Sequence, residues 1–184
     1  MNMPSLKQAE EAGSLFFLTI KTINGLPVLI NKDYYDVIID SLNFCRNHKD
    51  WGIYAYTILI NHLHLLLSIK KEDSLWNTIG DFKSYTAHEI LKLLKRDKQY
   101  DILAEMRIAA YKSNDRDNKI WRKNCWPEII ISDKFFWQKV DYIDFNAWQH
   151  GIVKDIENYI YTSYHNHYCK HNVILKIDNI EELF

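Results

Sequence analysis

The chain has 184 residues and a formal net charge of −1, with 47% hydrophobic and 26% charged residues, as expected for a globular domain with a sizeable core. Three scattered cysteines argue against a disulfide-stapled secreted scaffold and favour the reducing cytoplasm. The polar start has no apolar core of the signal-peptide type, and no apolar run is long enough to span a bilayer, so no secretion or membrane insertion is expected.

The chain is expected to form one domain over residues 14–184, preceded by a loose polar arm over residues 1–13. A basic insert is expected over about 98–124 and a mixed tail over about 152–184. Residues 83–123 carry 11 basic and 6 acidic side chains, although the whole chain is nearly neutral. Both a positive binding face and an ordinary solvated surface account for this distribution.

Apolar periodicity and turn signals predict alternating strands and helices along the chain. Ser74 is a candidate N-cap, Ser132 or Asp133 caps the last helix, and Gly151 ends it. The expected elements are a strand (14–22), a turn (23–27), a helix (32–50), two strand-like runs (51–60 and 61–69), a helix (74–97), a strand (125–132) and a helix (133–150). This order indicates an α+β fold in which a ferredoxin-like antiparallel sheet has helices packed on one face.

The stretch TILINHLHLLLSI (57–69) has the density of a buried strand and yet contains His62 and His64. Alternate residues of a strand point to the same face, so both imidazoles project together while Leu63 and Leu65 enter the core. Two adjacent imidazoles are able to bind a divalent metal, and two hydrogen-bonded, half-buried histidines are the structural alternative. Asn61 marks either a bend between two strands or a bulge in one.

The helix over 133–150 offers polar groups that would complete such a site. Tyr142 and Asn146 are four residues apart and therefore share a helix face. Asn146 carries a side-chain carbonyl oxygen, and Tyr142 carries a phenol that is able to act as a nucleophile beside a metal. Core packing with the hydroxyl at the surface is the structural alternative for Tyr142. His150 lies one further turn along the same face and is an alternative third ligand.

Several motifs together resemble the single-tyrosine HUH transposases, in particular the REP-associated tyrosine transposases and their insertion-sequence relatives. They are NHLHLLL (61–67), FKSYTAHEI (82–90), VDYIDFNAWQHGIV (140–153) and YIYTSYHNHY (159–168), and they occur in the order typical of that family. Ile60 and Ala147 stand where the family pattern has prolines. The resemblance runs from about residue 14 to about residue 180.

The resemblance implies a DNA transposase that cleaves and rejoins single-stranded DNA. It implies that His62, His64 and Asn146 hold Mg²⁺ or Mn²⁺ over a scissile phosphate, with imidazole ligands favouring Mn²⁺ somewhat. It further implies that Tyr142 attacks phosphorus, forming a 5′-phosphotyrosine and releasing a 3′-hydroxyl.

The implied partner is single-stranded DNA that carries a hairpin, with no membrane involvement. Family members occur both as monomers and as dimers, so a homodimer is one expected assembly. Basic side chains of the middle region are candidates for phosphate contacts. These candidates are Lys83, Lys92, Lys95, Arg107, Arg122 and Lys123.

Several alternatives remain open at this stage. The absent prolines and the low net charge fit a domesticated, non-catalytic protein that binds DNA hairpins, and a metal-dependent nuclease using water is a second possibility. Tyr85 is a rival nucleophile on the helix over 74–97. The stretch HNHYCKH (165–171) alternates potential zinc ligands, but on a flat strand they cannot surround one ion, so a polar edge strand is expected there.

Overall fold

The computed structural model describes residues 15–70, 73–112 and 119–179, so the expected arm over 1–13 lies outside the described residues. Its centre is a sheet in the order β2-β3-β1-β4, with every neighbouring pair antiparallel. The strands are β1 (Leu15–Lys21), β2 (Gly52–Leu59), β3 (His62–Ser68) and β4 (Glu128–Ile130). With a helix between β1 and β2 and another between β3 and β4, this topology confirms the expected ferredoxin-like α+β class.

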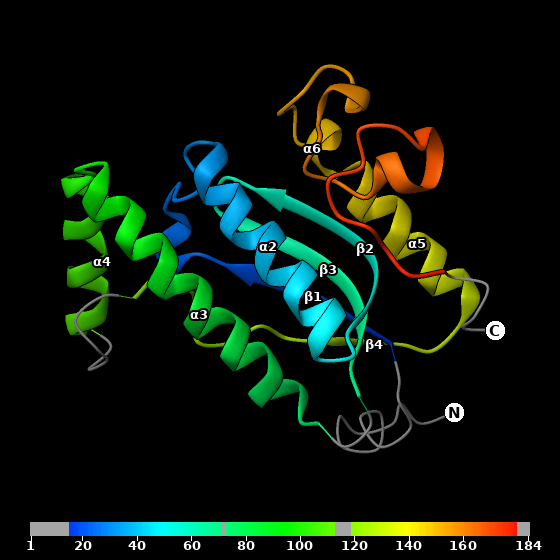
Figure 1. Cartoon of the computed structure of the whole chain (residues 1–184), viewed down its shortest axis with the longest axis horizontal. Coiled ribbons are helices and arrows are strands. Elements are labelled where there is room, and N and C mark those ends of the chain that lie inside the picture. The colour runs from blue at the N-terminus through cyan, green and yellow to red at the C-terminus, as the bar shows by residue number, and fades with distance from the viewer. Residues whose placement is uncertain (1–14, 71–72, 113–118, 180–184) are drawn as a thin grey trace.

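Two long helices cover one face of this sheet (Figure 1). They are α2 (Lys32–His48) and α3 (Leu75–Arg96), and both begin and end within two residues of the predicted bounds. Asn31 caps α2 by accepting a hydrogen bond from the backbone N–H of Asp33. Within the described ranges, no helix combines the length and the apolar character needed to cross a bilayer.

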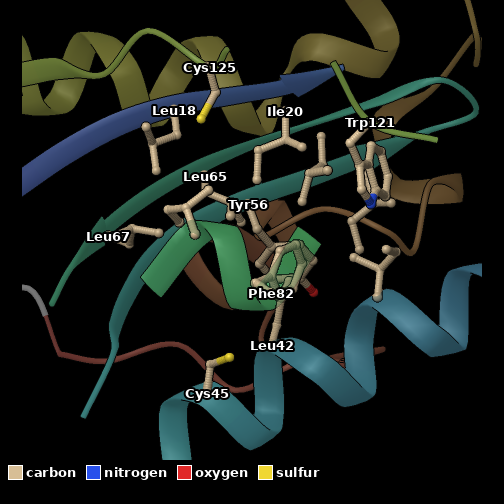
Figure 2. Packing of buried hydrophobic residues seen from close by; sticks show 14 of the residues in the cluster. Leu18, Ile20, Leu42, Cys45, Tyr56, Leu65, Leu67, Phe82, Trp121 and Cys125 are labelled. Carbon is tan, nitrogen blue, oxygen red and sulfur yellow. The ribbon is translucent and has the colours of Figure 1, made fainter. Parts of the chain in front are cut away.

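The main core fills the space between the sheet and these two helices (Figure 2). Leu65 and Leu67 enter it from β3, Leu42 from α2 and Phe82 from α3. Trp121 closes one end, and its indole N–H donates to Thr86 Oγ1 at 3.0 Å. Trp121 is therefore a core residue rather than an exposed stacking platform.

For the basic insert over about 98–124, charged and weakly periodic in sequence, a loop-rich region or a short helix was expected, and a helix is observed. The insert contains α4 (Tyr100–Lys112), which packs against α3. Residues 120–122 then run beside the end of β1, where Thr22 and Trp121 form an isolated bridge. The buried side chains of Leu103, Met106 and Ala110 explain why this stretch folds as a helix.

The second face of the sheet is covered by α5 (Asp133–Asp144), an arrangement that the expectation of helices on one face did not include. Its residues Phe136, Val140 and Ile143 pack on Phe17 and Leu66 of the sheet. Ser132 caps α5, as predicted, by accepting from the backbone N–H of Phe135. A break at Phe145 separates α5 from the short α6 (Asn146–Gln149), and Gly151, with φ +68°, follows.

The C-terminal segment runs along the free edge of β2. Ile58 N–H donates to the carbonyl of Tyr161, and Ser163 N–H donates to the carbonyl of Tyr56. Two short helical turns lie in this segment, η2 (Ile156–Asn158) and η3 (His165–Cys169). These contacts cover an edge strand that would otherwise expose unpaired backbone groups.

Candidate active site

The two histidines of β3 point to the α5 face of the sheet, opposite the leucines between them. Leu63 and Leu65 are completely buried in the main core, whereas His62 is partly exposed and His64 is 4% exposed. Residues 60 and 61 form a two-residue turn between β2 and β3, which settles Asn61 as a bend rather than a bulge. The alternation predicted from the sequence is therefore observed.

Both imidazoles use the same ring nitrogen for hydrogen bonding. His62 Nδ1 lies 2.6 Å from Asn61 Oδ1, and His64 Nδ1 lies 2.8 Å from Thr19 Oγ1. Because Asn61 Oδ1 can only accept, His62 Nδ1 carries the proton and Nε2 keeps its lone pair. A metal-binding histidine is oriented in this way, with its other ring N–H held by a neighbouring acceptor.

Burial keeps both rings neutral. Desolvation, with the positive charges of Lys21 and His150 adding to it, lowers the pKa of His62 to about 4. Desolvation together with the neighbouring His62 lowers the pKa of His64 to about 3. A neutral imidazole is the form that binds a metal, so neither ligand has to lose a proton at physiological pH.

Tyr142 of α5 stands directly beside the histidine pair. Its ring centroid lies 5.2 Å from that of His64 and 5.9 Å from that of Phe17. The residue is 37% exposed although its ring packs on Phe17 and His64. The rival Tyr85 lies on α3, across the sheet, where it lines a cleft of about 730 Å³ between α2 and α3.

Asn146 is completely buried and both atoms of its side-chain amide are without a hydrogen-bond partner. Its neighbours place it on the histidine face. Tyr142 precedes it and touches His64, while Ala147 follows it and packs on Leu59, which pairs with His62 across the β2–β3 ladder. A buried amide without partners is costly, and a divalent ion coordinated by its oxygen would relieve that cost.

The donor set therefore fits a divalent metal. Two neutral imidazoles from β3 and one unpartnered amide oxygen from α6 form this set, and the contact with Asn61 leaves the lone pair of His62 on Nε2. His150 is exposed and follows α6, and it remains the alternative third ligand.

The six basic candidates do not gather at this site. Lys83 is held by the backbone carbonyls of Arg122 and Lys123, at 2.7 and 2.8 Å, and Lys92 pairs with Glu89. The side chains of Arg122 and Lys123 are exposed. Lys95 and Arg107 are exposed on α3 and α4.

Two residues beside the site were missed by the sequence analysis. Thr19 faces His64 across the β1–β3 ladder and supplies its Nδ1 contact. Lys139 of α5 sits 4.1 Å from the Phe17 ring centroid, pairs with Glu128, and adds positive charge beside His64. Only the strand register and the packing of α5 reveal either residue.

Comparisons with known proteins show which sequences and folds this chain resembles. The family described as "Transposase IS200 like" matches residues 26–106, which include β2 and β3 but end before α5. A Haemophilus influenzae protein named "Putative REP-associated tyrosine transposase" is 25% identical over 154 residues, covering 83% of this chain and 81% of that protein. The REP-associated tyrosine transposase of Escherichia coli is 21% identical over 153 residues, which cover 83% of this chain and 78% of that protein.

The fold has a solved counterpart. The structure of a REP-associated tyrosine transposase bound to a REP hairpin matches 91% of this chain and 87% of that one, with a TM-score of 0.62 and 17% identity. Together the family match, the relatives and this shared fold confirm that the chain resembles the single-tyrosine transposases of the REP-associated and insertion-sequence type.

Proposed function

We propose that this chain, a relative of the single-tyrosine transposases, cleaves and rejoins single-stranded DNA through a covalent bond to Tyr142. The observation that carries the proposal is the contact between Tyr142 and His64, which joins a phenol to a neutral imidazole pair at one accessible site.

In this proposal His62, His64 and Asn146 hold Mg²⁺ or Mn²⁺. When bound, the ion acts as a Lewis acid on the oxygens of the scissile phosphate. The packing of Tyr142 on Phe17 and His64 restricts its ring and orients its hydroxyl. Tyr142 Oη loses its proton and forms a bond to phosphorus, while the bond to the 3′ oxygen breaks and that oxygen is protonated. The product is a 5′-phosphotyrosine, which a second 3′-hydroxyl is able to reverse.

The proposed substrate carries a hairpin, by analogy with the DNA in the solved relative. Arg122 and Lys123 are the basic residues best placed to meet its phosphates. The backbone N–H of Arg122 donates to the carbonyl of Lys21, and Lys21 pairs with His62 across the β1–β3 ladder. The exposed Trp126 follows them and offers an aromatic surface for a base.

The proposed cleavage site is complete within one chain. Tyr142 packs on His64 and Phe17 of its own sheet, and α5 is joined to that sheet by its own apolar residues. A monomer would then be competent to cleave. Mixing a His64→Ala variant with a Tyr142→Phe variant should restore no cleavage, whereas recovery in the mixture would indicate exchange of α5 between two chains of a homodimer.

The direct test uses labelled single-stranded DNA with a hairpin and flanking sequence, incubated with Mn²⁺ and analysed on a denaturing gel. Wild-type protein should give a protein-linked DNA band, and Tyr142→Phe should give none. Tyr85→Phe is the matched control, because Tyr85 is also partly exposed but lies across the sheet, and it should retain the band.

Two other outcomes would favour the alternatives. Cleavage that survives Tyr142→Phe, with no covalent product in wild type, would indicate a nuclease that uses water. Tight hairpin binding without cleavage, on DNA that carries flanking sequence on both sides, would indicate a non-catalytic hairpin-binding protein.

A further inference from the structure

The C-terminal segment contains a second group of metal-binding side chains, separate from the histidines of β3. His165, Cys169 and His171 each present one ligand atom, and these atoms all lie within 4.8 Å of one another. In a tetrahedral zinc site, neighbouring nitrogen and sulfur ligands are separated by about 3.4–3.6 Å. The group is thus close to the spacing that one ion would require.

The backbone explains how these residues come together. A polar edge strand was expected here, and that expectation is wrong. Residues 165–169 form the π-helical turn η3, which brings His165 and Cys169 to the same side. Lys170 and Asn172 then adopt left-handed conformations, with φ of 55° and 56°, and the chain folds His171 back toward His165. The two imidazole centroids are 5.8 Å apart.

His165 gives an independent indication of a ligand. It is completely buried, its Nε2 lies 3.2 Å from the carbonyl of Tyr159, and its Nδ1 has no hydrogen-bond partner. Because a carbonyl can only accept, Nε2 carries the proton and Nδ1 keeps a lone pair. An unpartnered buried nitrogen is costly, and a carbonyl that fixes the opposite ring nitrogen is the arrangement typical of metal-bound histidine.

The other two residues are arranged in a compatible way. His171 Nδ1 lies 3.0 Å from the carbonyl of Cys169, which again leaves Nε2 with its lone pair. Cys169 is partly accessible. The remaining cysteines, Cys45 and Cys125, are buried in the main core and face no histidine cluster of this kind in the described part of the chain.

We propose that His165, Cys169 and His171 bind one zinc ion that stabilises the C-terminal segment. One thiolate and two imidazoles form a soft ligand set that prefers zinc to magnesium, and water would take the fourth position. The site does not depend on the activity proposed for Tyr142.

The position of η3 gives this zinc a structural consequence. Ser163 and His167, on either side of His165, both contact the carboxylate of Asp144 at the end of α5. Tyr168 donates a hydrogen bond to Asp141 at 3.0 Å. Asp141 and Asp144 flank Tyr142, so an ion that stabilises η3 also stabilises the end of the helix that carries Tyr142.

The test measures zinc directly in the full chain. Purified protein is stripped with a chelator, reconstituted with Zn²⁺, desalted and analysed by elemental mass spectrometry. Wild type and the His62→Ala/His64→Ala variant should both retain one zinc per chain. Cys169→Ser and His171→Gln should each bind zinc at least about 100-fold more weakly, which exceeds the usual effect of a residue outside the coordination shell.

Cobalt substitution identifies the ligand that carries sulfur. Co²⁺ should give a thiolate-to-cobalt charge-transfer band in wild type and in Cys125→Ala, and no such band in Cys169→Ser. His171→Gln guards against misfolding, because His171 is exposed, and His88→Gln on α3 is its equally exposed control. Equal zinc affinity in wild type and in both ligand variants, or zinc lost only from the His62→Ala/His64→Ala variant, would overturn the proposal.

Discussion

The two faces of β3 show how one strand separates stability from chemistry. On the face toward α2 and α3, Leu63, Leu65 and Leu67 are completely buried in a continuous apolar core (Figure 2). On the face toward α5, His62 and His64 lie beside Tyr142, and the buried amide of Asn146 lacks a partner. A buried amide without a partner, next to two neutral imidazoles and a partly exposed phenol, indicates a site kept for binding.

The largest expected effect comes from a substitution on the apolar face of β3. Leu65→Ala should lower the free energy of unfolding by about 2–5 kcal/mol, because it leaves a cavity in the main core. Urea unfolding followed by circular dichroism measures the change. The rate of cleavage per folded molecule should stay near that of wild type, and a specific loss of cleavage would contradict the separation of the two faces.

The next largest effect is expected from a substitution on the polar face of β3. His64→Ala should reduce DNA cleavage at least about 100-fold through loss of a metal ligand. It should change the free energy of unfolding far less than Leu65→Ala does. A gel assay with labelled hairpin DNA measures the rate, with His88→Gln as an exposed histidine control. Full cleavage by His64→Ala would remove the histidine pair from the mechanism.

Acid should destabilise the metal-free protein through the same face. The pKa values of His62 and His64, about 4 and about 3, lie below the value near 6.5 expected in the unfolded chain. The unfolded state therefore binds more protons below pH 6.5, and stability is full above that pH and falls as the pH drops toward 4 and 3.

With allowance for partial solvent access, this loss should amount to about 1–3 kcal/mol. This loss of stability is measured from the midpoints of urea unfolding, recorded in the presence of a chelator between pH 7 and about 4.5. A His62→Gln/His64→Gln variant should lose less stability over that interval. An identical loss in the variant would mean that other groups govern the acid response.

The smallest effect is expected from substitutions of single basic residues, which test on which face of the sheet the DNA binds. Arg122→Ala and Lys123→Ala should each weaken hairpin binding modestly and lower the slope of log affinity against log salt by about 1. Lys95→Ala, which removes an exposed lysine from α3 on the opposite face, is the matched control. Fluorescence anisotropy over a salt series distinguishes them. An equal effect of Lys95→Ala would place the DNA across both faces.

Much of this arrangement was predictable because it follows from local periodicity. Alternation along β3 placed His62 and His64 together. The single helix expected over 133–150 is broken at Phe145, so Tyr142 lies on α5 and Asn146 on α6. The order of strands and helices gave the ferredoxin-like sheet. Each of these inferences uses neighbours in sequence, which backbone geometry alone brings together.

Other features depend on distant contacts or on unusual backbone. Thr19 meets His64 only through the β1–β3 register, 45 residues apart in sequence. Lys83 is a candidate phosphate contact in the sequence, but in the fold its ammonium group donates to the carbonyls of Arg122 and Lys123, about 40 residues away along the chain. The π-helical turn at 165–169 reads as an alternating strand, because the left-handed residue Lys170 has no sequence signal comparable to glycine.

The most direct test of the account is to identify the residue that becomes linked to DNA. Wild-type protein is incubated with hairpin-flanked single-stranded DNA and Mn²⁺, digested with nuclease and protease, and analysed by tandem mass spectrometry. The account predicts a nucleotide joined through its 5′-phosphate to Tyr142. Linkage to Tyr85 or to another tyrosine, or cleavage with no linked peptide, would contradict it.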